Sequence, residues 1–456
     1  MSVSKNVLEL VGNTPLVKVN HLDCGPCELF LKLESHNPGG SIKDRIALSM
    51  ITAAEQDGSL KPGGTLVEAT AGNTGLGLAL VASQKGYKLI LVIPDKMSQE
   101  KIFHLKALGA EVVITRTDVG KGHPEYYHDM AERIAKERGG FYVNQFENPN
   151  NPVTHERTTG PEIWEQMNHQ VDAVVCGVGS GGTLTGLGRY FARVAPTCEM
   201  VLADPKGSVL APFINEGVMI EAGSWLVEGI GEDFIPKNCD LSLVKKAYTI
   251  SDTESISTAR ELLHKEGIIC GSSSGTLIAA ALSYCRAQKT PKRVVSFVCD
   301  SGNKYLSKIY NEYWLDDHGL VIKNEAHDLR DLITRPHTGK NAITIMPSDT
   351  LQAAYRKMRM YDVSQLPVMD NGKLVGIVNE TDILLAITGN PKGFGIEVAQ
   401  AMTKNLLTIQ MDKPMEDLLP IFERGMVAIV MDKYEFLGII TPIDLLQYLR
   451  KRTGVA

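Results

Sequence analysis

The sequence predicts an α/β protein in two parts, a large domain on a parallel, helix-covered sheet and a smaller duplicated module after it. Apolar strands and amphipathic helices alternate from residue 65 to about residue 300, a pattern typical of buried parallel strands. Further on, "KLVGIVNETDILLAI" (373–387) is repeated as "EFLGIITPIDLLQYL" (435–449), 62 residues later. The 456 residues also exceed the roughly 250–300 at which one core stops growing.

These patterns set the domain boundaries that we expect. The polar stretch "DDHGLVIKNEAHDLRDLITRPHTGKN" after Trp314 is typical of a linker. Each repeat has the pattern strand-helix-strand-strand-helix, and because one such unit cannot bury its apolar face alone, the two should pack together. We predict a large domain, a linker and two repeats over 1–317, 318–341, 342–390 and 398–452.

The first long helix is expected over residues 42–57, where apolar residues recur at a helical period. Ser41 is the expected N-cap, with Asp44 as the acidic partner of a capping box. Lys43 therefore lies in the first turn, where the helix dipole disfavours a cation by only about 0.3–1 kcal/mol. Only burial lowers a lysine pKa by several units. On this stretch alone, a surface lysine is the simpler interpretation.

The strands and helices that follow place the loops of the large domain. Helices are expected from about residues 73, 98 and 124. Ligands of such sheets bind at the carboxyl ends of the strands, so the loops after the strands are where we expect chemistry. Strands are predicted at 65–70, 88–95, 110–116, 141–146, 172–179, 200–205 and 294–300.

Three polar loops stand out at those positions. "TAGNTGLGLA" (70–79) offers backbone N–H groups, hydroxyls and one amide at a helix start, which suits a small carboxylate or an ordinary cap. "CGVGSGGTLTGLGRY" (176–190) joins a strand to a helix through a glycine turn that suits a phosphate. "EGIICGSSSGTLIAAA" (266–281) has three serines in a row, which could cap one helix or bond a ring nitrogen.

Two ligands compete for these loops. Gly177, Gly179 and Gly182 spell GxGxxG and Asp204 follows 22 residues later, so an NAD-dependent dehydrogenase has to be considered. That cofactor leaves Lys43 and the serine loop unexplained. A ligand with a phosphate, a polar aromatic ring and a carbonyl that binds an amine explains all three loops, and pyridoxal 5'-phosphate (PLP) is such a ligand.

Composition excludes several other classes of protein. A formal charge of −6 argues against nucleic acid as a partner. The N-terminus has no basic segment before a long apolar run, and no window approaches 18 apolar residues, so we expect a cytoplasmic protein without membrane contact. Cys24 and Cys27 form a CxxC that we interpret as a plain loop rather than a redox dithiol. No second CxxC is present, and no metal site is expected.

The motifs resemble those of the fold-type-II PLP enzymes of sulfur amino-acid metabolism, which share the tryptophan synthase β-like fold, over about residues 5–315. "NPGGSIKDR" is similar to their cofactor-lysine motif, "TAGNTG" to their substrate and ring loop, and "GSGGT" to their phosphate loop. "ADPKGSVL" (203–210) and "VEGIGEDFIP" (227–236) resemble the cystathionine-forming branch. The related cysteine synthases usually carry glutamine in place of Glu228 and a small residue in place of Glu232 or Asp233.

This resemblance implies a role for each matching residue. Lys43 would hold PLP and act as the catalytic base, Asn73 would bond the ring hydroxyl, and Ser273 would face the pyridine nitrogen. The phosphate would lie on Gly179, Ser180, Gly181, Gly182 and Thr183. The substrate would contact Thr70, Ala71, Thr74, Gln145 and Gly231. Ala71 replaces the serine usual there, which removes one hydroxyl.

The implied activity is PLP-dependent β-replacement, which condenses L-serine with L-homocysteine to L-cystathionine and water. L-cysteine as first substrate would release hydrogen sulfide by the same route. Cysteine synthesis from O-acetylserine and sulfide is the alternative, and a non-enzymatic nucleotide sensor is an alternative of another class. Barely ten residues precede "LVGNTP", so the haem-binding extension of some relatives is not expected. The resemblance also implies a homodimer or a higher homo-oligomer.

The C-terminal repeat resembles a CBS-domain pair, a module that binds adenosyl ligands. The aspartate that binds ribose in such modules matches Asp382 and Asp444. Thr441 matches the hydroxyl position before it, whereas Asn379 departs from it in the first repeat. The resemblance implies S-adenosylmethionine or an adenine nucleotide as a regulatory ligand, and a structural or dimerising role is the alternative.

Overall fold

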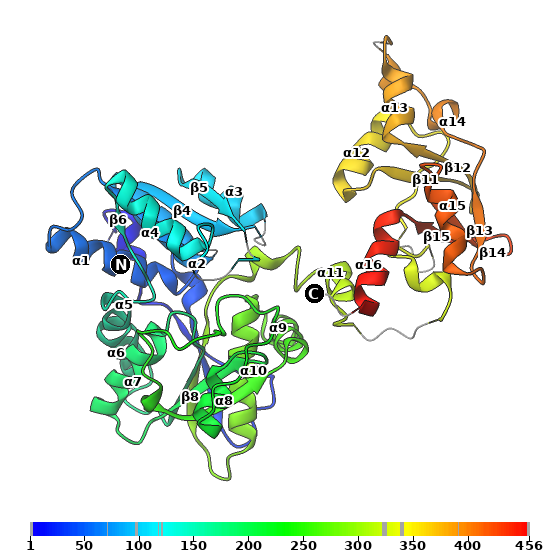
Figure 1. Ribbon diagram of the computed structural model, residues 1–456. Helices are drawn as coiled ribbons and strands as arrows, with labels where there is room; N and C mark the ends of the chain where they lie inside the picture. The colour runs from blue at the N-terminus through cyan, green and yellow to red at the C-terminus, as the bar shows by residue number, and fades with distance from the viewer. Residues whose placement is uncertain are drawn as a thin grey trace. The chain divides into compact units, whose positions relative to one another are not determined.

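The structure is a computed structural model that describes residues 3–70, 72–95, 99–116, 118–119, 122–321, 326–337, 342–390 and 392–453. Its internal contacts divide the chain into two compact units, Met1–Asn311 and Glu312–Ala456 (Figure 1). The boundary predicted after residue 317 stays a prediction. In the described residues, no helix has both the length and the apolar character needed to cross a membrane.

The first unit contains two sheets. One has six strands in the order β1-β2-β10-β7-β8-β9, all parallel except the antiparallel pair β1 and β2. Its strands are β1 Leu16–Lys18, β2 Glu28–Leu33, β7 Ala173–Cys176, β8 Glu199–Pro205, β9 Val244–Ile250 and β10 Arg293–Val298. The other is parallel, in the order β5-β4-β3-β6, with β3 Thr65–Ala69, β4 Lys88–Pro94, β5 Glu111–Thr115 and β6 Phe141–Tyr142.

Helices connect and cover these strands, as the alternating pattern predicts (Figure 1). The predicted strands are confirmed, although the one expected at 141–146 is only two residues long. The division into two sheets could not be read from the alternation, because a pattern of buried strands does not say which strands pair. The helices are α1 Lys43–Gln56, α2 Asn73–Lys85, α3 Gln99–Ala107, α4 Tyr127–Arg138, α5 Asn150–Thr154, α6 Gly160–Gln166, α7 Gly182–Val194, α8 Leu210–Glu216, α9 Asp252–Glu266 and α10 Ser272–Arg286.

The predicted capping box of α1 is wrong. The helix begins at Lys43, and the Ser41 hydroxyl does accept from the Lys43 backbone N–H at 3.2 Å. The Asp44 carboxylate, however, accepts from the backbone N–H of Gly39 rather than from Ser41. Ser41 is instead paired in a β-bridge with Asp300, which follows β10. The start of α1 is therefore fixed to the carboxyl end of a central strand.

A buried ionic network also fixes α1. Arg45 contacts Glu34 at 2.7 Å and Glu162 at 2.7 Å, and Lys32 contacts Glu162 at 2.8 Å. Lys32 and Glu34 are fully buried in and after β2, and Glu162 belongs to α6. Removal of one partner from such a network typically costs 3–5 kcal/mol, because it leaves an uncompensated charge. The backbone around Lys43 is thus firmly anchored.

The second unit contains the duplicated module. In each half a parallel pairing precedes an antiparallel hairpin; the parallel pairing is one Ile345–Val368 bridge in the first half and the β13–β14 pair in the second. Each half has its own apolar cluster. The elements are α11 Glu312–Asp317, α12 Leu351–Tyr361, β11 Gln365–Asp370, β12 Lys373–Asn379, α13 Glu380–Ile387, α14 Val398–Ala401, β13 Thr408–Gln410, α15 Leu419–Phe422, β14 Ala428–Asp432, β15 Glu435–Ile440 and α16 Pro442–Thr453.

Candidate active site

Lys43 lies at the first position of α1, at the edge where the central strands end. Part of its side chain is exposed to solvent. The surrounding protein atoms nevertheless remove water from around the ammonium group. Desolvation lowers the pKa of Lys43, and the nearby Cys299, Asp300 and Glu232 offset part of that decrease. A lysine that releases its proton readily is what a carbonyl-binding amine and a general base require.

The glycine turn between β7 and α7 is built for close approach. Gly181 has a φ of +84°, which side chains rarely adopt. A Cβ on Gly182 would collide with the Asn151 side-chain oxygen, and one on Gly179 would lie 2.5 Å from the Gly229 carbonyl. The first N–H groups of α7 have no acceptor within the helix and lie at its positive end. The turn is therefore a cradle for a phosphate.

Two side chains that the sequence did not single out hold this turn in place. The Asn151 amide donates to the Ser180 hydroxyl at 2.8 Å and to the Gln145 carbonyl at 2.8 Å. Thr183 contacts His155 at 3.3 Å, and His155 is buried. Desolvation lowers the pKa of His155 well below its usual value, and the charges of Arg45 and Lys43 add to this. The charge of Lys43 therefore affects His155, the histidine that contacts Thr183 of the glycine turn.

The three consecutive serines at the start of α10 have different hydrogen-bond partners. The Ser272 hydroxyl accepts from the Glu228 backbone N–H at 3.0 Å, and the Ser274 hydroxyl accepts from the Cys299 N–H at 2.9 Å. Within the part of the chain that the structure describes, the Ser273 hydroxyl has no hydrogen-bond partner. Two serines therefore serve the protein itself, and Ser273 remains available to a ligand.

The loop from β3 to α2 brings predicted substrate residues together. The Thr74 hydroxyl donates to the Gln145 side-chain oxygen at 2.6 Å, and both residues are buried. The Thr70 hydroxyl accepts from the backbone N–H of Gly72 at 3.3 Å. Ala71, the fourth predicted substrate residue of this group, lies outside the described residues. Thr74 and Gln145 thus form one buried polar pair, as two residues that serve a common ligand group would.

Asn73 is the first residue of α2 and faces the segment after β10. Its Nδ2 donates to Asp300 at 2.8 Å, and its Oδ1 accepts from Lys304 at 2.9 Å. Asp300 also accepts from the Tyr305 hydroxyl at 2.7 Å. The stretch "CDSGNKY" (299–305) begins with the last two residues of the strand predicted at 294–300, so the rule that ligands bind at strand ends could have found these residues.

The segment from Glu228 to Glu232 passes beside the glycine turn. Gly231 has a φ of +88°, and its N–H donates to the Val178 carbonyl at 2.9 Å, so this amide is used within the protein. Lys101 contacts one oxygen of Glu228 and Lys308 the other, the latter at 2.6 Å. Burial alone would raise the pKa of Glu228, but the two ammonium groups lower it below its usual value.

Glu232 has the opposite electrostatic state. Desolvation raises its pKa well above the usual value, and the neighbouring Asp233 and Asp204 raise it further, while Lys43 lowers it. The side-chain oxygen lies 4.0 Å from the Cβ position of Gly179. Glu232 therefore lies beside the glycine turn, and the charge of Lys43 acts on its carboxyl group.

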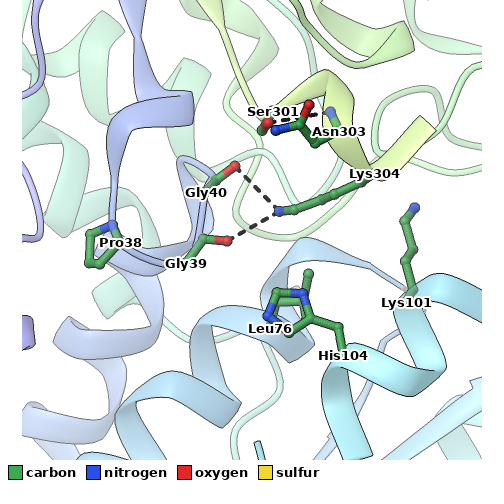
Figure 2. A pocket seen from close by; sticks show the side chains of 9 residues that line it. All are labelled: Pro38, Gly39, Gly40, Leu76, Lys101, His104, Ser301, Asn303 and Lys304. Atoms are coloured by element: carbon green, nitrogen blue, oxygen red, sulfur yellow. Dashed lines mark hydrogen bonds between the residues drawn. The ribbon is translucent and has the colours of Figure 1, made fainter. Parts of the chain in front are cut away.

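A cavity of about 310 Å³ opens beside Asn73 and Lys304. Figure 2 shows Lys304 reaching across it toward the Gly39–Gly40 turn, with Lys101 and His104 contributed by α3. The volume is at the lower end of the range for small-molecule sites. Its lining residues are Pro38, Gly39, Gly40, Leu76, Lys101, His104, Ser301, Asn303 and Lys304.

These observations fit PLP. The site combines an amine with a lowered pKa, a turn whose close packing admits only glycine and a serine hydroxyl without a protein partner. The dehydrogenase hypothesis does not fit, because Asp204 is buried and its Oδ2 accepts from the backbone N–H of Ala211 at 2.8 Å. That carboxylate is fully buried at the start of α8, where a ribose hydroxyl does not reach it.

The remaining chemical motifs are weaker. Cys24 and Cys27 are both free, and desolvation, with Asp23 and Glu266, raises the pKa of Cys24 to about 11. A redox dithiol needs a lowered thiol pKa, so the plain-loop interpretation is favoured. Among the described residues, no three His, Cys, Asp or Glu side chains are grouped as metal ligands.

In the second unit, the two predicted ribose aspartates cap their own helices. Asp382 and Asn379 form a reciprocal capping box at the start of α13, with both bonds at 2.9 Å. Asp444 accepts from the Thr441 backbone N–H at 2.7 Å and from the hydroxyls of Thr441 and Thr334. The Asn379 that departs from the family pattern therefore has a structural use.

Asp444 also lines a cavity of about 190 Å³ within this unit. The cavity lies among α11, the segment 331–334 and α16, and the ion pair from Arg450 to Asp317 at 2.7 Å joins the two helices. Its volume is below the roughly 300 Å³ at which small-molecule sites begin, so it would have to widen for a whole nucleoside. The lining residues are Tyr313, Trp314, Asp316, Asp317, Asp331, Leu332, Ile333, Thr334, Asp444, Gln447 and Tyr448.

Comparison with known proteins agrees with both units. Residues 7–300 match the family described as pyridoxal-phosphate dependent enzyme, and residues 329–389 and 397–451 each match the CBS domain. A cystathionine beta-synthase of Dictyostelium discoideum is 38% identical over 464 residues, which cover 98% of this chain and 93% of that protein. One from Apis mellifera is 35% identical over 463 residues, covering 98% and 91%.

A solved structure extends the agreement to the fold. A hydrogen sulfide-producing enzyme from Fusobacterium nucleatum is 37% identical, with a TM-score of 0.62 over 67% of this chain and 100% of its own. The large unit is thus a fold-type-II PLP enzyme, and the dehydrogenase and non-enzymatic sensor hypotheses are wrong. Because the full-length relatives share both units in this order, the chain belongs to the cystathionine β-synthase family of PLP-dependent enzymes.

Proposed function

We propose that this chain condenses L-serine with L-homocysteine to L-cystathionine and water. The observation that carries the proposal is the meeting of Lys43, the glycine turn and Ser273 at one edge of the central sheet, beside a threonine-rich loop. Curated relatives over nearly the whole chain are named cystathionine beta-synthase, which supports this choice of substrates. The individual residue roles below are part of the proposal.

The protein's own groups divide the work around the cofactor. Bound PLP supplies an electron sink that stabilises negative charge at the α-carbon of the amino acid. Lys43 takes the α-proton, which its lowered pKa favours, and returns a proton to the departing hydroxyl as water forms. Ser273 offers a neutral partner to the ring nitrogen, which keeps that nitrogen largely unprotonated and favours β-elimination over transamination.

The substrate carboxylate is held by Thr70 and Thr74, around the start of α2, and by Gln145, which follows β6. Hydroxyls, an amide and the N-terminus of α2 supply donors there without a fixed positive charge. Such a site orients the α-carbon toward Lys43. Because it has no fixed positive charge, it binds a carboxylate only moderately, so the product can leave. Gly231, the remaining predicted substrate residue, is bonded to Val178 directly before the glycine turn.

The segment at Glu228 affects which nucleophile the site accepts as its second substrate. A carboxylate that bridges Lys101 and Lys308 connects α3 with the segment after β10. Glutamine, which the cysteine synthases usually carry there, would not balance the two ammonium charges. Glu228 therefore favours homocysteine over sulfide as the nucleophile, and cysteine synthesis from O-acetylserine remains the second candidate.

Two parallel assays test the proposal. The holoenzyme is given serine plus homocysteine in one and O-acetylserine plus sulfide in the other, and cystathionine and cysteine are quantified. We expect cystathionine formation to have the larger kcat/KM. A larger kcat/KM for cysteine formation would show that the chain is a cysteine synthase instead.

Lys43→Ala tests the role of the amine itself. Loss of a general base typically lowers a rate about 10²–10⁴-fold, and the visible absorbance of lysine-bound PLP should vanish with it. Lys136→Ala is the matched control, because Lys136 lies on α4 with 76% of its side chain exposed. A Lys43→Ala protein with the visible spectrum of the wild type would refute the assignment.

We further propose that the CBS-domain pair takes an adenosyl ligand, S-adenosylmethionine first, at the Asp444 cavity. A carboxylate beside Thr441 and Thr334 suits ribose hydroxyls, although the ligand would displace the present Thr334 bond. Titration calorimetry with S-adenosylmethionine, AMP and ATP tests this in the wild type and in Asp444→Ala. No heat with any of them would favour the structural role. The homodimer stays a prediction for sedimentation analysis.

A further inference from the structure

We propose that Lys304 is a positioning residue whose ammonium orients and polarises the Asn73 amide toward the ring of PLP, provided that PLP occupies the site proposed above. Lys304 lies in the segment after β10, outside every motif that the sequence singled out. Its contacts assign it to the ring side of the site rather than to the substrate side.

The two neighbours of Asn73 leave its amide one orientation. The Lys304 ammonium can only donate, and it lies 2.9 Å from Oδ1. The Asp300 carboxylate accepts, and it lies 2.8 Å from Nδ2. Exchange of the amide oxygen and nitrogen would place donor against donor and acceptor against acceptor. The second hydrogen of Nδ2 faces the Tyr305 hydroxyl, and the ring hydroxyl that Asn73 is proposed to bond would compete for it.

Lys304 has no donor left for a substrate, although it lines the 310 Å³ cavity. An ammonium has three hydrogens, and Lys304 has three acceptors: Asn73 Oδ1, the Gly39 carbonyl at 3.2 Å and the Gly40 carbonyl at 3.3 Å. Figure 2 shows the two bonds to the turn. The same side chain therefore joins the turn that leads into Lys43 to the residue at the ring hydroxyl.

Lys304 lies among charged groups in a desolvated place. Desolvation lowers the pKa of Lys304 below its usual value, the carboxylates of Asp300 and Asp44 offset part of that decrease, and Lys101 adds to it. His104 is also close, since Lys304 lowers its pKa. In so desolvated a place a unit charge acts more strongly than in water. The charge of Lys304 should therefore be felt through Asn73 at the ring.

The test uses the visible absorbance band of the PLP-loaded protein, followed as a function of pH. Lys304→Met removes the charge and all three donors at similar length. Loss of a positive charge and of an oriented donor both favour the protonated ring system, so we expect the midpoint pH to rise by about one unit. Lys304→Arg should stay near the wild type. Lys265→Met, on an exposed part of α9, is the control.

A double-mutant cycle separates positioning from mere structural support. If Lys304 acts through Asn73, then Lys304→Met should not move the midpoint further in an Asn73→Ala background. Additive shifts would overturn the proposal. Lys304→Gln keeps two N–H donors but no charge, so its midpoint must also rise. If Lys304→Met does not fold, Lys304→Gln alone tests the positioning role. An unchanged midpoint in Lys304→Gln would overturn the proposal.

The experiment also separates this inference from the proposed function. A wild-type protein without any visible band after PLP addition would refute the cofactor site itself. A wild-type band that Lys43→Ala abolishes, together with wild-type midpoints in both neutral Lys304 variants, would refute only the positioning role.

Discussion

Glu68 is a carboxyl group buried at the end of β3, directly before the substrate loop. Its two oxygens accept from the backbone N–H groups of Ala69 at 3.1 Å and Gln145 at 3.3 Å. Desolvation still dominates and raises the pKa of Glu68 to about 8. The loop that we propose for the substrate carboxylate is therefore held by a group with a pKa of about 8, just above neutral pH.

The pH dependence of stability follows from this raised pKa. The stability that protonated Glu68 contributes is complete below its unfolded value of 4.5 and is lost as the pH rises through about 8. The side chain in Glu68→Gln cannot ionise, so its stability should not follow this change. Between about pH 5 and about pH 8.5, the free energy of unfolding of the wild type should therefore fall relative to that of the variant. The expected fall is a few kcal/mol, which corresponds to a pKa difference on the order of three units.

Denaturant unfolding at several pH values measures that difference. Glu132→Gln is the control, because Glu132 lies on α4 with 54% of its side chain exposed. A gap between wild type and Glu68→Gln that does not change with pH would show that Glu68 ionises normally.

At the residue scale, the sequence predicts the groups that stand in motifs. Lys43, Asn73 and Ser273 were found because each follows a polar loop pattern, and the structure gathers them at one sheet edge. Asp300 and Lys304 were missed, because their importance comes from contacts with residues more than two hundred positions away. No local pattern carries that information. The roles of the motif residues stay predictions.

The element that most depends on sequence detail is the glycine turn before α7. A methyl group at Gly182 would push against Asn151, which in turn holds Ser180 and the Gln145 carbonyl. Overpacking of this kind typically costs about 1–3 kcal/mol. Because the phosphate would lie on the same backbone, affinity for PLP should suffer more than the fold.

We therefore predict that Gly182→Ala weakens PLP binding at least about tenfold, since 1.4 kcal/mol corresponds to a factor of ten. Titration of the apoprotein with PLP, followed by absorbance, gives the dissociation constant. Gly395→Ala is the matched control, because a Cβ there meets nothing within 4 Å. Equal PLP affinity in both variants would contradict the placement of the phosphate.

At the element scale, the sequence predicts most of the strands but not their partners. Hydrophobic alternation placed β3, β4 and β5 within one or two residues of their observed bounds. The choice between one sheet and two depends on which strand faces meet, which is a matter of long-range packing. The capping box at Asp44 failed for the same reason, because Ser41 had already paired with Asp300.

At the scale of the whole molecule, each unit has its own apolar clusters. We expect two transitions in calorimetry, of which PLP raises only one, since a ligand stabilises the unit that binds it. Ile440→Ala should destabilise the other by about 2–5 kcal/mol, because Ile440 is fully buried in its core.

Leu446→Ala is the control for that measurement, because Leu446 lies on α16 with 60% of its surface exposed. It should leave both transitions nearly unchanged. If Ile440→Ala shifted the PLP-sensitive transition equally, the chain would unfold as one cooperative body. The sequence predicted the two-part organisation from the repeat and the chain length, since both report directly on how many cores a chain needs.

The ionic network of Arg45 has a consequence for the catalytic cycle. Arg45 lies two residues after Lys43 and is ion-paired with Glu34 and Glu162. These ion pairs hold the backbone at Lys43 in place. In the proposed reaction, in which Lys43 would release and regain the carbonyl carbon of PLP, only the four methylene groups of its side chain would have to move. The proposed step would then require no rearrangement of the backbone.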